Sequence, residues 1–251
     1  MPKPLPTKLE KEPIVEAACQ LQVVSSVPLS TFLPGLLFSK YPNDISAFQA
    51  LPLAKVPEIV RNSQPDMAFA SLMQLKYKDV LVAIGERSVT VLSITPYLGW
   101  SRFKTRIIEV FNLAFELKLI SSVSRYSIKY TNVLTGNENL NSLDALELNI
   151  KIGGLDLNKQ TTALRMDTRT SDGLVTVITI HGSVTVQVAE QAPIQGAMII
   201  VDTICGDSPQ ESEDFGTHMS EKLDRLRYVN KETFFECITD EAIHALGPSY
   251  K

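Results

Sequence analysis

Hydrophobic positions alternate with polar ones along much of the chain, at the period of two that is typical of strands with one buried face. These runs predict strands over residues 14–24, 69–78, 80–84, 88–94, 126–134, 145–152, 162–170, 174–180 and 198–204. Within the last strand, the unbroken apolar run from Met198 to Val201 predicts burial on both faces. Ser171-Asp172-Gly173 predicts a hairpin turn, because glycine readily adopts positive φ.

Apolar residues recur at three- and four-residue spacing in two longer segments, which predicts amphipathic helices. One helix is expected over 101–118 with Ser101 as its N-cap, and the core stripe of the other runs from Met219 to Thr233. Shorter helices are expected over 31–41 and after Thr239, which is a second N-cap candidate. Proline-rich residues 42–66 and acidic residues 206–216 are predicted to be loops.

The order of these elements predicts an α+β fold, with one or two antiparallel sheets carrying the long helices on one face. Residues 1–12 read as an extended N-terminal arm that adds nothing to the core, and residues 13–251 read as a single domain. Strands come first and a long helix last in both 13–118 and 119–251, so these ranges are candidates for two related β-α-β-β-α halves.

Composition indicates a folded protein inside the cell. The chain has 251 residues, 44% of them hydrophobic, and a formal net charge of −4. That charge gives no long-range attraction to nucleic acid or anionic lipid. The three cysteines form no CxxC pair, and no apolar run is long enough to cross a bilayer. A cytoplasmic protein with reduced thiols and no membrane contact is expected.

Familiar catalytic motifs are absent from the sequence. It contains no glycine-rich phosphate loop and no signature of the common hydrolases or zinc proteases. The spacing of His218, His244, Cys205 and Cys237 matches no zinc pattern. We therefore expect no catalytic residue, no metal and no cofactor.

Two groups of residues are candidates for a binding site. Arg165, Asp167 and Arg169 alternate with less polar neighbours, so all three should project from one face of a strand. They would bind an anion there, or form an ion-pair ladder on a solvated face.

The second candidate group is the basic and aromatic segment 100–130. Basic residues interleaved with aromatic rings are typical of single-stranded nucleic-acid binding, because cations neutralise phosphate and rings stack on bases. The alternative is a solvent-facing helix that needs charges. For Trp100, the simplest interpretation is a packing anchor at the helix entry, with ligand stacking second. The candidate residues of the segment are Trp100, Arg102, Arg106, Arg125 and Lys129.

Several short motifs resemble the landmarks of a sporadically distributed bacterial family whose function is unknown. The motifs are Pro13-Ile14-Val15-Glu16-Ala17, Gly99-Trp100-Ser101-Arg102-Phe103, Arg125-Tyr126 with Tyr130-Thr131-Asn132, and Phe234-Phe235 with Ile238-Thr239-Asp240-Glu241-Ala242. The resemblance implies a link to bacterial defence or mobile elements, because a patchy distribution is typical of such genes. It brings no catalytic residue with it.

Together these features favour a non-catalytic binding or scaffold protein, whose partner is another protein or a second copy of the chain. The alternative function is nucleic-acid or nucleotide binding through the segment 100–130. A third hypothesis is an enzyme with an unfamiliar site around Arg165, Asp167 and Arg169.

Overall fold

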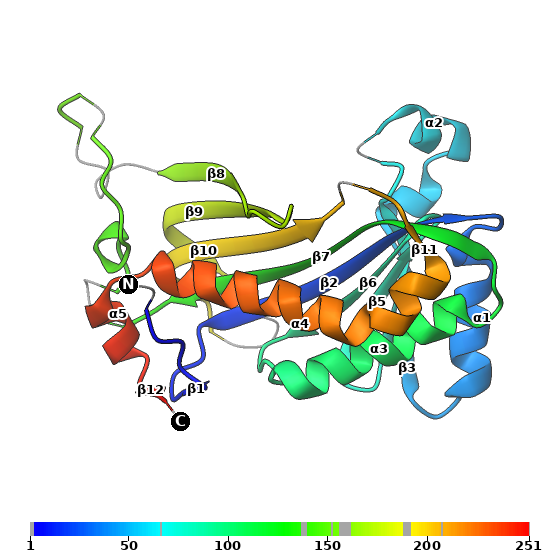
Figure 1. Ribbon diagram of the computed structural model, residues 1–251, viewed down its shortest axis with the longest axis horizontal. Coiled ribbons are helices and arrows are strands. Elements are labelled where there is room, and N and C mark those ends of the chain that lie inside the picture. Colours follow the sequence, from blue (N-terminus) through cyan, green and yellow to red (C-terminus); the bar gives the residue numbers. More distant parts are fainter. Residues whose placement is uncertain are drawn as a thin grey trace.

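One large antiparallel sheet organises the protein (Figure 1). The computed structural model describes residues 3–65, 67–136, 140–151, 153–155, 162–187, 192–206 and 208–250. The sheet has ten strands in the order β3-β4-β5-β6-β2-β7-β10-β9-β8, and β11 pairs with β7. The predicted α+β class with an antiparallel sheet is confirmed.

The elements have the following bounds. The strands of the sheet are β2 (Ile14–Ser25), β3 (Ile45–Ala50), β4 (Ser71–Tyr77), β5 (Val80–Gly85), β6 (Ser88–Ile94), β7 (Ile120–Leu134), β8 (Ala163–Arg169), β9 (Val175–Val186), β10 (Ile194–Cys205) and β11 (Gln210–Glu211). The helices are α1 (Leu29–Lys40), α2 (Glu58–Ser63), α3 (Trp100–Phe115), α4 (Ser212–Glu236) and α5 (Asp240–Ala245), with 3-10 turns η1 (Pro52–Lys55) and η2 (Leu143–Ala145).

The centre of the sheet is the long pair formed by β2 and β7. On one side of this pair, the meander β4-β5-β6 ends with β6 against β2, and the chain then enters α3. On the other side, β8-β9-β10 ends with β10 against β7, and the chain then leads to α4. Each long helix therefore follows a strand that neighbours the central pair.

Helices α3 and α4 lie side by side in front of the sheet in the view of Figure 1. Helix α4 contacts β7 and β10, while α3 contacts β6 and α4. Phe103, Ile107 and Phe111 of α3 are fully buried, together with Leu223 and Leu226 of α4. Burying a large apolar side chain contributes about 1.5–3 kcal/mol, so the packing of these helices on the sheet stabilises the fold.

The prediction of a strand over 145–152 was wrong for the residues that the structure describes. Leu146 makes an isolated bridge to Ile238, and the backbone N–H of Glu147 donates to the carbonyl of Cys237. Residues 147–151 then continue without strand pairing. Leu146 is buried in a second apolar cluster with Phe234 and Phe235, so its apolar character reflects packing near the end of α4.

Both predicted loops contain regular structure. Residues 42–66 include β3, η1 and α2, and the acidic stretch 206–216 includes β11 and the first turn of α4. Glu213 and Asp214 occupy that first turn, where carboxylates interact favourably with the helix dipole. Ser101 is not an N-cap, because α3 begins at Trp100 after Gly99, whereas Thr239 does cap α5 by accepting from the Ala242 N–H.

The N-terminal arm is anchored to the other end of the chain. Its strand β1 (Lys8–Leu9) pairs with β12 (Pro248–Ser249), and Figure 1 shows the arm beside the C-terminal half of α4. Leu5 and Leu9 pack against the second apolar cluster. The prediction that residues 1–12 add nothing to the core was therefore wrong for these two side chains.

Candidate functional site: the open face of the sheet

The face of the sheet opposite α3 and α4 is less buried than the face beneath them. Along β9, buried Thr176, Ile178 and Ile180 alternate with partly exposed Val175, Val177 and Thr179. Strand β10 repeats this pattern, so the predicted burial of Met198–Val201 on both faces was wrong. We call the less buried side the open face.

One continuous row shows how polar groups are placed across the open face. Residues paired across neighbouring antiparallel strands project to the same side of a sheet. The pairing register connects, in order, Lys76, Leu81, Leu92, Ala18, Lys129, Asp202, Val177 and Asp167. Charges from four different strands therefore belong to one surface.

Strand β8 carries the first predicted candidate group at one edge of this surface. The register pairs Arg165 with Thr179, Asp167 with Val177 and Arg169 with Val175, which places all three charged residues on the open face. The Nε of Arg165 lies 3.3 Å from Oδ1 of Asp167. Both side chains are more than half exposed, so this ion pair contributes little to stability.

Strand β7 places two residues of the second candidate group on the same face. Arg125 lies 3.6 Å from the carboxylate of Asp202 on β10, and Lys129 lies 3.5 Å from that of Glu16 on β2. Desolvation raises the pKa of Asp202, and the charges of Arg125 and Lys129 partly offset this effect. Sequence reasoning missed Asp202, although a carboxylate within an apolar strand is a signal for a charged neighbour.

The aromatic residues of the same segment lie on the opposite side of the sheet. Tyr126 and Tyr130 are buried in the main core, and the Tyr130 hydroxyl lies 2.9 Å from that of Tyr97. The interleaving of Arg125 and Lys129 with tyrosines is therefore the two-residue period of a strand. It does not place rings and cations together for base stacking.

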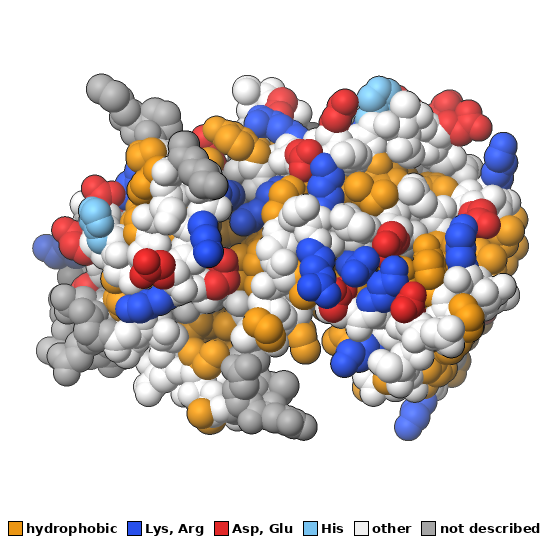
Figure 2. Space-filling model, turned by 90° about the horizontal axis from the view of Figure 1, so that it is seen from below, with side chains coloured by type: hydrophobic (Ala, Val, Ile, Leu, Met, Phe, Trp, Pro, Cys, Tyr) orange, Lys and Arg blue, Asp and Glu red, His pale blue; other side chains and the backbone are white. Residues whose placement is uncertain are grey.

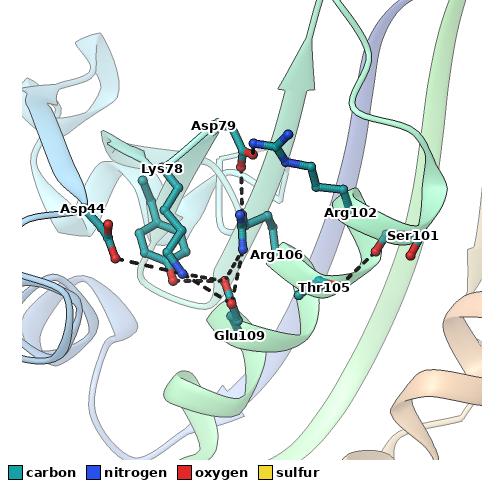
Figure 3. A network of polar contacts seen from close by, with 9 residues as sticks. Asp44, Lys78, Asp79, Ser101, Arg102, Thr105, Arg106 and Glu109 are labelled. Atoms are coloured by element: carbon teal, nitrogen blue, oxygen red, sulfur yellow. Dashed lines mark hydrogen bonds and ion pairs between the residues drawn. The ribbon is translucent and has the colours of Figure 1, made fainter.

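The remaining candidates, Trp100, Arg102 and Arg106, belong to α3 and hold that helix in place. Arg102 and Arg106 both pair with Asp79 in the β4–β5 turn (Figure 3), and Arg106 Nε is 2.8 Å from Oδ1 of Asp79. Trp100 donates its indole N–H to Asp224 of α4 over 2.9 Å. The structure thus separates these three residues from Arg125 and Lys129.

Glu109 extends this network to the two residues that precede Asp79 at the same turn. It accepts hydrogen bonds from Tyr77, Lys78 and Arg106, and Lys78 also lies 3.9 Å from Asp44. Figure 2 shows Lys and Arg side chains intermixed with Asp and Glu on the face it displays, without a large area of one sign. The α3 cations are therefore neutralised locally.

The open face carries more positive than negative groups. Among the described strand residues, its cations are Lys76, Arg125, Lys129, Arg165 and Arg169, and its carboxylates are Glu16, Asp167, Asp202 and Glu211. Five cations against four carboxylates leave one positive charge, on a chain whose net charge is −4. Such a surface attracts a negatively charged partner.

Metal chemistry receives no support within the described ranges, where no three His, Cys, Asp or Glu side chains lie close enough to hold an ion. His218 sits in the first turns of α4, with Nδ1 3.1 Å from the carbonyl oxygen of Asp214. Cys19, Cys205 and Cys237 are free thiols, and burial raises the pKa of Cys19.

Comparison with known proteins gives no relative from which function could be transferred. No family model matches the chain, and no curated protein matches it. Among the described helices, none is long and apolar enough to cross a membrane.

Proposed function

We propose that this chain is a non-catalytic binding protein, and that its open sheet face recognises an acidic segment of a partner protein. The observation that supports this proposal is the excess of cations on that face of an otherwise acidic chain. Exposed ion pairs such as Arg165 with Asp167 cost little to exchange for a partner's carboxylates.

A protein partner fits this surface better than single-stranded nucleic acid. Base stacking contributes about 1–3 kcal/mol per base and needs exposed rings. In the central strands, Tyr126 and Tyr130 are buried beneath the helices, and Arg102 and Arg106 belong to the α3 network. The alternative function would therefore have to rely on charge alone.

The proposal can be tested by fluorescence anisotropy with a labelled peptide of alternating glutamate and serine. We expect saturable binding that weakens as salt rises, and at least a fivefold loss of affinity in Arg165→Glu. Lys55→Glu is the matched control, because it makes the same charge change at an exposed residue of η1.

Two further measurements complete this experiment. One is the affinity for a labelled oligonucleotide of equal charge, and the other is the oligomeric state of the protein. Equal affinity for peptide and oligonucleotide, or equal loss in both variants, would contradict recognition of a protein by this face. A dimer that dissociates in Arg165→Glu would assign the face to a second copy of the chain and overturn the proposal.

We further propose that residues 13–118 and 119–251 are related halves, each with its long helix on the covered side of the sheet. The support is their similar order: a central strand, then a meander that returns to it (β3-β4-β5-β6 in the first range, β8-β9-β10 in the second), and then a long helix. The resemblance to a sporadically distributed bacterial family extends the proposal to a partner in defence or mobile-element biology. Loss of phage or plasmid resistance on gene deletion, restored by the wild-type gene and not by Arg165→Glu, is the expected result.

A further inference from the structure

A cavity of about 60 Å³ lies on the covered side of the sheet, away from the open face. The N-terminal arm, the end of β7 and the C-terminal half of α4 form its walls. Its polar lining is contributed by Thr7, Lys8, Glu12, Tyr130, Asn132, Arg227, Asn230 and Lys231. Leu9, Ile14, Phe234 and Phe235 complete the wall with apolar side chains.

Two polar groups in this lining, Oδ1 of Asn230 and the guanidinium of Arg227, make no hydrogen bond to the described residues. Asn230 is 1% exposed, and its Nδ2 donates to the carbonyls of Ile128 and Val201, but its Oδ1 accepts no hydrogen bond. Arg227 stacks on Tyr130 with 4.3 Å between its Cζ and the ring centroid. Within the described part of the chain, its guanidinium makes no hydrogen bond or ion pair. A buried acceptor without a donor, such as Oδ1 of Asn230, is rare unless a ligand or water satisfies it.

The charges in the lining do not balance. Arg227 and Lys231 are one turn apart on α4 and interact electrostatically with one carboxylate, that of Glu12. Lys231 also donates to the carbonyl of Pro6 in the arm. With Lys8 of the arm, the lining holds three cationic side chains, Lys8, Arg227 and Lys231, and one carboxylate, that of Glu12. A small anion would reduce this excess of positive charge.

We propose that this cavity binds a small α-hydroxy acid. The carboxylate of the ligand would lie against Arg227 and Lys231, and its hydroxyl would donate to Oδ1 of Asn230. Arginine presents a planar donor fork that matches a carboxylate. One water molecule needs roughly 10–15 Å³ of such a cavity volume. A volume of 60 Å³ therefore accommodates a ligand of about five or six non-hydrogen atoms, the size of glycolate or lactate.

The lining selects this class of ligand because the carboxylate and the hydroxyl each match one feature of it. Acetate has the carboxylate but no donor for Asn230, and glycine has a donor but no net charge. A site that hydrogen-bonds a hydroxyl discriminates strongly against an analogue that lacks it. The predicted order of affinity is therefore glycolate and lactate first, with acetate and glycine at least tenfold weaker.

Isothermal titration calorimetry of the full chain with sodium glycolate, L-lactate, acetate and glycine tests this proposal. Arg227→Gln is expected to weaken glycolate binding at least tenfold. Arg225→Gln is the matched control, because Arg225 lies on the same helix but pairs with Asp172 outside the cavity. The expected affinity of Arg225→Gln is within twofold of the wild type.

Circular dichroism of each variant checks that it is folded. The Arg227→Lys variant provides a second test of the binding site. Arg227→Lys retains the charge but loses the planar fork, so it should bind glycolate with intermediate affinity. No heat from any of the four compounds at millimolar concentration would overturn the proposal and leave a water-filled cavity. Equal binding by Arg227→Gln and Arg225→Gln, or a preference for glycine or acetate, would also overturn it.

Discussion

The two faces of the central strands differ in what they contribute to the protein. On the covered face of β7, Tyr126 and Tyr130 are buried with Ile128, whereas Arg125 and Lys129 of the open face reach carboxylates of neighbouring strands. The covered face provides stability through apolar burial, and the open face provides charge that a partner can use. Adjacent residues of one strand therefore have unrelated roles.

The largest expected difference in stability is between variants of two neighbouring residues on β7. Ile128 is 0% exposed, so Ile128→Ala should lower the free energy of unfolding by about 2–4 kcal/mol through lost burial and a residual cavity. Lys129→Ala, one residue further on, should change it by less than about 0.5 kcal/mol. Urea unfolding of both variants measures the difference. Similar losses would show that the open face also carries the fold.

Asn230 tests whether polar contacts on the covered face matter as much as apolar ones. Its amide bridges α4 to β7 and β10 through the carbonyls of Ile128 and Val201 and the hydroxyl of Thr203. Asn230→Ala should lower the free energy of unfolding by about 2 kcal/mol, because buried acceptors lose their donor. Thr131→Ala on the open face is the control and should lose less than about 0.5 kcal/mol in the same urea titration.

Two aspartates extend the comparison to pH. Desolvation of Asp79 is outweighed by Arg106 and Arg102, so its pKa is lowered, whereas desolvation dominates at Asp202 and its pKa is raised. The stabilisation from Asp79 is present above the unfolded-state pKa and is lost as pH falls through the lower folded value. At Asp202 the cost of ionisation grows as pH rises from the unfolded-state pKa through the higher folded value.

Asparagine variants of these two residues should therefore have opposite effects at pH 7. Asp79→Asn removes an acceptor of Arg102 and Arg106 and should lower the free energy of unfolding by about 1–2 kcal/mol. Asp202→Asn should leave it unchanged or raise it by up to about 1 kcal/mol. Thermal unfolding between pH 3 and pH 7 should show both differences shrinking toward low pH. A loss of stability in Asp202→Asn at pH 7 would contradict the assigned direction.

Sequence periodicity predicted the strands better than it predicted their partners. The alternation of Arg165, Asp167 and Arg169 correctly placed these residues on one face, because side-chain direction in a strand is local. The same kind of alternation over 145–152 predicted a strand that does not form in 145–151, since a strand also needs a neighbour with free backbone groups. Acidic residues near 213 were interpreted as a loop, although their position favours a helix N-terminus.

The candidate site was only partly predictable for the same reason. Arg125 and Lys129 do lie on one face of β7, but grouping them with Tyr126 ignored the two-residue period of a strand. Their grouping with Arg102 and Arg106 relied on closeness in sequence, and the fold places those residues on α3. The cavity lining joins Glu12, Asn132 and Arg227 from three distant segments, which no local pattern can bring together.

The smallest expected effect concerns the ion pair between Lys129 and Glu16 on the open face, where Nζ and Oε1 are 3.5 Å apart. Both side chains are more than one-third exposed, so solvent and salt screen their attraction. A double-mutant cycle with Lys129→Ala and Glu16→Ala should give a coupling energy below about 0.5 kcal/mol that disappears at 1 M salt. Both single variants should nevertheless alter the salt dependence of acidic-peptide binding, in opposite directions. A coupling above about 1 kcal/mol would mean that the pair is structural, and the open face would then lose one of the cations available to a partner.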